Sequence, residues 1–166
     1  MEDRGGELVS ARFRLAYSPS DGDFRVMDFS SLLRSGRVPR IDGFFRAGGG
    51  VREVLYDGPQ LSWFRLGPPF TPDWEYDIDD IEEIDWADRA DLVSQQGSVC
   101  CGEGSMGADG FFARLDPAGI PIWVAFMTRS NPFLHVRVDG AIAIFTNNLD
   151  HSVIIDLNQP TYGYGW

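Results

Sequence analysis

The chain has 166 residues, of which 43% are hydrophobic and 13% aromatic, a composition typical of a globular protein. This length predicts a single domain over residues 1–166, whose folding buries roughly 70% of the unfolded surface. No apolar run approaches the roughly 20 residues of a membrane-spanning helix, so we expect no membrane association. The formal net charge of −11 is concentrated in residues 73–166, where four arginines face sixteen acids. Such a negative surface repels phosphate backbones, so direct nucleic-acid binding is not expected.

The N-terminal stretch and the cysteines indicate a compartment. The opening residues, MEDRGGELV, are charged and lack the apolar segment of a secretory signal. Cys100 and Cys101 are the only cysteines, and because they are adjacent, a bridge between them could not join distant elements. Both observations favour a reducing environment, and we expect a cytoplasmic protein.

The first 72 residues predict short strands and one short helix. Residues 8–17 alternate between apolar and polar side chains, which indicates a half-buried strand, and residues 24–29 form the return strand. Asp28 or Ser30 is expected to cap a short helix over 31–35 that Gly36 ends. Further strands are expected near 51–56 and 61–66, joined by an Asp57-Gly58 turn.

An acidic segment, residues 73–91, carries ten acids and one arginine. Its first part alternates, with Trp74, Tyr76 and Ile78 on one face, and is predicted to be a strand. Its second part has apolar residues at helical spacing, so we expect a helix from about 79 to 93.

The last third of the chain predicts an antiparallel β-meander over residues 111–157. Short apolar runs are separated by turn sequences such as Pro-Ala-Gly and Asp139-Gly140. The expected strands span 111–116, 120–127, 133–138, 141–146 and 152–157, in one sheet. The fold class expected is therefore α+β and β-rich, an antiparallel meander sheet with one or two short helices, the acidic helix lying on a face or edge of the sheet.

The stretch GEGSMG at 102–107 matches the G-x-G-x-x-G pattern of dinucleotide-binding loops. That site requires a helix directly after the last glycine, because the helix N-terminus holds the pyrophosphate. Here Gly107 is followed by a second turn and then by a predicted strand. We therefore expect no dinucleotide site, and instead a glycine-rich loop over 102–110 that can approach a partner closely.

The chain shows no convincing catalytic or metal-binding pattern. Cys100 or Cys101 could act as a nucleophile with His135 or His151 as base, but no spacing brings either histidine to the thiols. Two adjacent cysteines and two scattered histidines also make a poor metal site. We expect no catalytic residues, cofactor or metal. A small cysteine-dependent hydrolase or transferase remains an alternative, as does a homo-oligomeric subunit whose edge strand pairs with its own copy.

The acidic segment is the main candidate for a binding surface, because aromatic residues are interleaved with its acids. Aromatic side chains anchor interfaces, and surrounding charges steer the encounter with a basic partner. The candidate partner-binding residues are Trp74, Tyr76, Asp77, Asp79, Asp80, Glu82, Glu83 and Trp86, with Glu103 and Asp109 from the glycine-rich loop.

The stretches GADGFFARLDPAGIPIWVAFMTRSNPF and FTNNLDHSVIIDL resemble C-terminal portions of small actinobacterial proteins of the immunity type, which neutralise cognate polymorphic toxins. The resemblance covers about the last third of the chain and carries no functional residue across. It implies a non-catalytic inhibitor that occludes the basic active cleft of a protein toxin acting on nucleic acids or NAD. Either the acidic segment or the glycine-rich loop could make the contact.

Overall fold

The computed structural model describes residues 12–14, 26–71, 81–159 and 163–165, which form strands and one short helix. The helix, α1, covers Phe29–Arg34 and ends at Gly36, whose φ of +73° suits glycine, as predicted. Because α1 begins at Phe29, directly after β2, Ser30 lies inside the helix and not at the position before it. The strands are β1 (Arg12–Arg14), β2 (Val26–Asp28), β3 (Arg37–Pro39), β4 (Gly43–Arg46), β5 (Val51–Tyr56), β6 (Phe64–Pro69), β7 (Ile81–Glu83), β8 (Asp85–Asp91), β9 (Ser98–Glu103), β10 (Gly110–Leu115), β11 (Pro121–Met127), β12 (Phe133–Asp139), β13 (Ile142–Asn147), β14 (Ser152–Asp156) and β15 (Gly163–Gly165).

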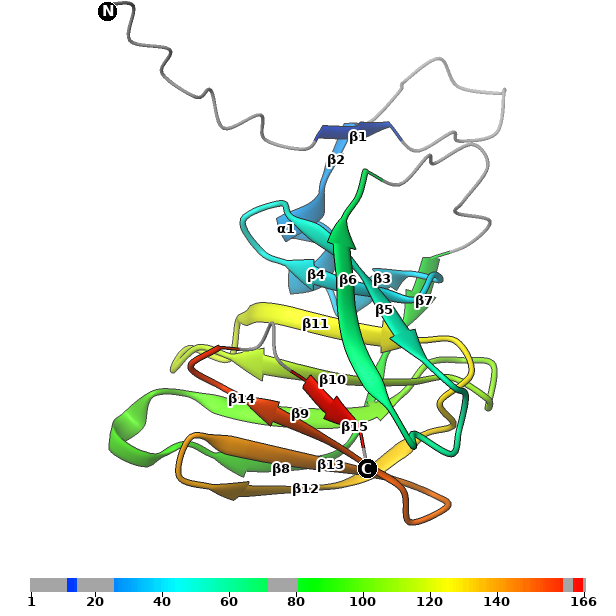
Figure 1. The fold of residues 1–166 in the computed structure, drawn as a ribbon. Coiled ribbons are helices and arrows are strands. Elements are labelled where there is room, and N and C mark those ends of the chain that lie inside the picture. The colour runs from blue at the N-terminus through cyan, green and yellow to red at the C-terminus, as the bar shows by residue number, and fades with distance from the viewer. Residues whose placement is uncertain (1–11, 15–25, 72–80, 160–162, 166) are drawn as a thin grey trace, which may run out of the picture.

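Every described strand pair is antiparallel, which confirms a β-rich fold of antiparallel sheets. The larger sheet has seven strands in the order β6-β5-β4-β11-β10-β9-β8, and the smaller has four in the order β12-β13-β14-β15. Two ribbons, β1-β2 and β3-β7, complete the arrangement. Figure 1 shows the smaller sheet, in orange and red, lying against the β8–β10 part of the larger one, while β5 and β6 turn away steeply.

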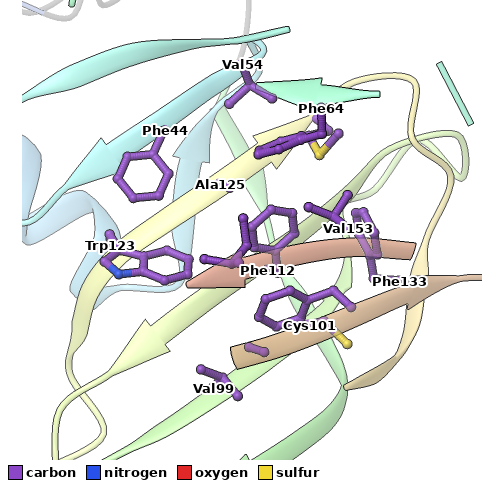
Figure 2. Close-up of a cluster of buried hydrophobic side chains, with 14 of the residues drawn as sticks. Phe44, Val54, Phe64, Val99, Cys101, Phe112, Trp123, Ala125, Phe133 and Val153 are labelled. Atoms are coloured by element: carbon purple, nitrogen blue, oxygen red, sulfur yellow. The ribbon is translucent and has the colours of Figure 1, made fainter. Parts of the chain in front are cut away.

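A buried cluster between the two sheets forms the main core. Phe112 of β10 lies at its centre, with its ring stacked 4.5 Å from that of Phe145 in β13 and edge-on to Phe133 of β12 at 5.4 Å. Trp123 of β11 packs edge-on against the same ring at 6.2 Å (Figure 2). These aromatic contacts join the two sheets into a sandwich.

The opposite face of the larger sheet is also buried, under α1 and β3. Phe111, next to Phe112 in sequence, faces this second cluster together with Leu33 of α1 and Val38 of β3. A sheet that is covered on both faces needs strands that are apolar at successive positions. This explains runs such as VCC and FFA, in which neighbouring side chains supply different cores.

The predicted meander over 111–157 is divided between the two sheets, so the expectation of one sheet is wrong. β10 and β11 pair inside the larger sheet, whereas β12, β13 and β14 build the smaller one. The crossing segment, residues 128–132, is held by tertiary contacts: the Asp42 carboxylate accepts hydrogen bonds from Thr128 N and the Tyr56 hydroxyl, each 2.7 Å long. Burial, together with the nearby Asp42, raises the pKa of Tyr56 above its usual value, so its hydroxyl remains a donor.

The helix predicted over 79–93 is also wrong where the structure describes it. Residues 81–83 form β7 and residues 85–91 form β8, and a single turn of 3₁₀ helix follows at Val93–Gln95. A β-bulge between Trp86 and Asp88 reverses which residues face inward, so Ile84 packs against the helix-side core and Ala90 against the sandwich core. The apolar residues Ile81, Ile84, Ala87 and Ala90 are three positions apart, which is close to the period of an α-helix. The strand predicted at about 73–78 lies entirely outside the described residues.

Candidate partner-binding surface

The described residues include five of the ten predicted partner-binding positions. These five lie on β7, β8, β9 and the loop after β9, at one end of the larger sheet. Described are Glu82, Glu83, Trp86, Glu103 and Asp109; Trp74, Tyr76, Asp77, Asp79 and Asp80 fall in the segment 72–80, outside the described residues.

Two of the predicted contact residues are buried and hold the glycine-rich loop in place. Glu82 is only 2% exposed; its carboxylate accepts hydrogen bonds from the Ser105 hydroxyl and from Ser105 N, the latter at 3.1 Å, and lies 3.5 Å from Arg40 Nε. Asp109, 1% exposed, accepts a hydrogen bond from Gly104 N at 3.1 Å. Neither carboxylate is available to a partner at the surface, so their expected contact role is replaced by an anchoring role.

The glycines of GEGSMG are explained by close packing and turn geometry. A Cβ on Gly102 would lie 1.8 Å from the carbonyl oxygen of Asp85, and one on Gly104 would lie 2.7 Å from Asp109 Oδ2. Gly107 has a φ of +76°, in the left-handed region that favours glycine. The next element is strand β10, as predicted, so the helix N-terminus of a dinucleotide site is not formed here.

The exposed part of the acidic segment presents carboxylates on one face of β8 and a tryptophan on the other. In the pairing of β8 with β9, Asp85 lies directly opposite Glu103, and Trp86 lies opposite Gly102 with 49% of its surface exposed. Within the described part of the chain, no cation forms an ion pair with Asp85 or Glu103; Glu83 pairs with Arg37 at 3.7 Å. Like charges placed opposite each other destabilise a sheet. We call Glu83, Asp85, Trp86 and Glu103 the acidic edge.

Asp85 was not singled out by the sequence, because a helical interpretation does not place it beside Glu103. Only the strand register, with its bulge, brings the two carboxylates together. Finding Asp85 from the sequence would have required predicting strands at both 85–91 and 98–103, and neither was expected.

An apolar hollow of about 70 Å³ adjoins the acidic edge on the helix side of the larger sheet. Its lining includes the half-exposed Trp86, Ile84 and Leu33. Trp86 therefore combines an exposed face with apolar neighbours, as an interface anchor does.

The edge position of β8 bears on the homo-oligomer alternative. β8 is the last strand of the larger sheet, and its side chains include Asp85, Asp88, Arg89 and Asp91. Asp88 also accepts a hydrogen bond from Val136 N of β12 at 2.9 Å. Charged side chains at a sheet edge disfavour pairing with another copy through that edge.

Both thiols lie in the core, which disfavours the cysteine-dependent alternative. Cys100 and Cys101 are fully buried, and burial raises the pKa of each thiol to about 12. A nucleophilic cysteine needs a lowered pKa and a base within reach. No hydrogen bond among the described residues joins a thiol to His135 or His151, and no group of three potential metal-ligating side chains occurs among them.

Comparisons with family models, with curated proteins and with solved structures return no match. In the part of the chain that the structure describes, no helix has the length and apolar character that a membrane crossing requires.

Proposed function

We propose that the chain is a non-catalytic protein inhibitor, an immunity protein that neutralises a cognate toxin by covering the basic active cleft of that toxin. The observation that carries this proposal is the acidic edge: two carboxylates, Asp85 and Glu103, face each other without a described cation, and the half-exposed Trp86 follows on the opposite face of the same edge strand. A surface of this kind is suited to a basic partner.

The energetic argument compares the free chain with the complex. In the free chain, the Asp85–Glu103 pair destabilises the sheet by roughly 0.2–1 kcal/mol, the range of cross-strand pairs. A guanidinium or ammonium group from a partner removes this repulsion and makes charge-assisted hydrogen bonds with both carboxylates. Trp86 adds a large, rigid contact area on the opposite face of the same edge strand, and tryptophan is enriched among interface hot spots.

The sign of the charge indicates the class of partner. Toxins that act on nucleic acids or on NAD bind phosphate groups in basic clefts, and an acidic surface fits such a cleft in place of the substrate. Electrostatic attraction also accelerates association. An inhibitor of this kind acts where the toxin acts, which for these substrates is the cytoplasm.

The proposal predicts that a neighbouring reading frame encodes a large secreted protein with a toxic C-terminal domain, and the test is growth rescue by co-expression with that domain. The wild-type chain should restore growth, while a variant carrying W86A, D85N and E103Q should not. The matched control, D139N with D150N, removes the same number of charges at exposed positions away from the acidic edge. Equal rescue by both variants would place the interface elsewhere, and a neighbouring protein without toxicity would overturn the proposal.

A further inference from the structure

A second charged surface, of opposite sign, lies at the other end of β10. A groove of about 800 Å³ opens there, and three arginines line it: Arg34 at the end of α1, Arg46 at the end of β4 and Arg114 on β10. The residues of the smaller sheet that border it are Leu157 and Asn158, which follow β14. In a chain whose net charge is −11, three arginines around one hollow are a local reversal of sign.

The strand register places two of these arginines on one face of the sheet. Trp123 of β11 pairs with Arg46 on one side and with Arg114 on the other. Directly paired residues point to the same face, so the two arginines flank Trp123, about 10 Å apart across two strand spacings. Trp123 is only 3% exposed and forms the rigid floor between them, at the margin of the buried cluster in Figure 2.

The positive charges of this groove are not balanced by the protein. None of the three arginines has an ion pair with a described residue. Arg114 donates one hydrogen bond from Nη1 to the Leu157 carbonyl at 3.0 Å, and its buried Nε has no partner among the described residues. Partial burial of a guanidinium without a carboxylate is unfavourable, and a bound anion removes that cost.

The one carboxylate lining the groove is already engaged. Asp116 Oδ1 accepts hydrogen bonds from Ala118 N and Ile120 N, each 2.9 Å long, in the turn between β10 and β11. Asp116 therefore shapes the turn and forms no ion pair with the three arginines, so its single negative charge leaves the groove net positive.

The turn between β4 and β5 leaves the groove open. Gly48 and Gly50 line it, and a Cβ on either would meet no atom within 4 Å. Neither of these glycines has the positive φ that would require glycine. Their missing side chains keep the backbone accessible, as at sites where a ligand approaches closely.

We propose that this groove binds the phosphate group of a small organic molecule. Guanidinium groups match the geometry and the double charge of a phosphate group. The groove has the size of small-molecule sites, roughly 300–1,000 Å³. Ile120 and Ile122, both partly exposed, supply an apolar border for the organic part of the ligand.

The groove is separate from the acidic edge. Arg114 pairs with Val99 of β9, four residues from Glu103 along the same strand, which corresponds to about 13 Å. The inference therefore does not depend on the proposed inhibitor function, and each can fail without the other.

Titration calorimetry with inorganic phosphate and with adenosine 5′-monophosphate tests the proposal, at an ionic strength held constant with chloride. We expect the nucleotide to bind, and R46Q and R114Q each to weaken it by about tenfold, the effect of losing one charge-assisted hydrogen bond. The control R65Q removes an exposed arginine on β6, outside the groove, and should bind as wild type does.

R46Q keeps the test decisive if R114Q is unstable, because the Arg46 side chain is exposed and forms no ion pair with a described residue. A thermal upshift with the nucleotide that is lost in R46Q supports the site independently. The proposal is overturned if neither probe binds at roughly 10 mM, ten times a millimolar Kd. It is also overturned if R46Q and R65Q bind the nucleotide with equal affinity. It is also overturned if an acidic peptide binds the groove and both phosphate probes do not.

Discussion

Replacing Glu82 with alanine is expected to destabilise the protein far more than replacing its neighbour Glu83. The two residues have the same chemistry and adjacent positions in β7, but the Glu82 side chain is 2% exposed and the Glu83 side chain 78%. Glu82 accepts two hydrogen bonds from Ser105 and pairs with Arg40, whereas Glu83 makes only the exposed ion pair with Arg37. The comparison therefore isolates the effect of burial.

The expected magnitude follows from these contacts. Alanine at position 82 leaves both Ser105 donors without their acceptor and Arg40 without its partner. Removing one member of a buried ion pair costs about 3–5 kcal/mol, and because Arg40 is partly exposed we expect about 3 kcal/mol. For a protein of this size, that lowers Tm by roughly 6–12 °C. The exposed pair of Glu83 contributes about 0–1 kcal/mol.

Urea unfolding of E82A, E83A and wild type gives the two free-energy differences directly. E82Q keeps an acceptor oxygen for Ser105 and should lie between E82A and wild type. The amide hydrogen of Ser105 should exchange faster in E82A than in E83A, because only E82A removes its acceptor. Equal unfolding free energies for E82A and E83A would refute the anchoring role, since Glu82 would then contribute no more than a surface charge does.

Three further outcomes are expected. The free energy of unfolding should fall as pH rises from 9.0, the ordinary thiol pKa, towards about 12, because Cys100 and Cys101 stay protonated longer in the folded chain. The free energy of unfolding should fall by roughly 1 kcal/mol per thiol at pH 10. Urea titrations at pH 8 and pH 10 measure this fall, which should be smaller in a double cysteine-to-alanine variant. An identical fall in the variant and the wild type would contradict the assignment to the thiols. F112A should cost about 3–5 kcal/mol by denaturant unfolding, because Phe112 joins the two sheets; a cost below about 1 kcal/mol would show that the sandwich does not depend on it. N147A should cost about 2–4 kcal/mol, since the buried Asn147 side chain makes four hydrogen bonds to backbone groups. The exposed Asn148 is the control, and comparable Tm shifts for N147A and N148A would be the opposite result.

Sequence patterns predicted the elements whose causes are local. The hairpin of β12 and β13 follows from alternating side chains and the Asp139-Gly140 turn, in which Gly140 has a φ of +59°. The end of α1 follows in the same way from Gly36. These features depend on the conformational preferences of a few neighbouring residues, so no distant contact is needed to specify them.

The predicted helix over 79–93 failed because of a feature that is not local. The bulge at Trp86–Asp88 exists because β8 pairs with β9, and it changes the face to which later residues point. A three-residue spacing of apolar side chains is then compatible with a bulged strand as well as with a helix. Pairing with β9 decides between the two.

The sequence by itself determined that the chain is β-rich, through its alternating apolar residues and turn sequences, and strongly acidic, with the acids concentrated in its second half. Only the tertiary structure decided that Glu82 is an internal anchor while Asp85 and Glu103 face each other at the surface, and that Arg46 and Arg114 flank Trp123. The physical reason is that burial and cross-strand register join residues far apart in the chain. Two carboxylates with identical chemistry therefore acquire opposite roles from the strands that pack beside them.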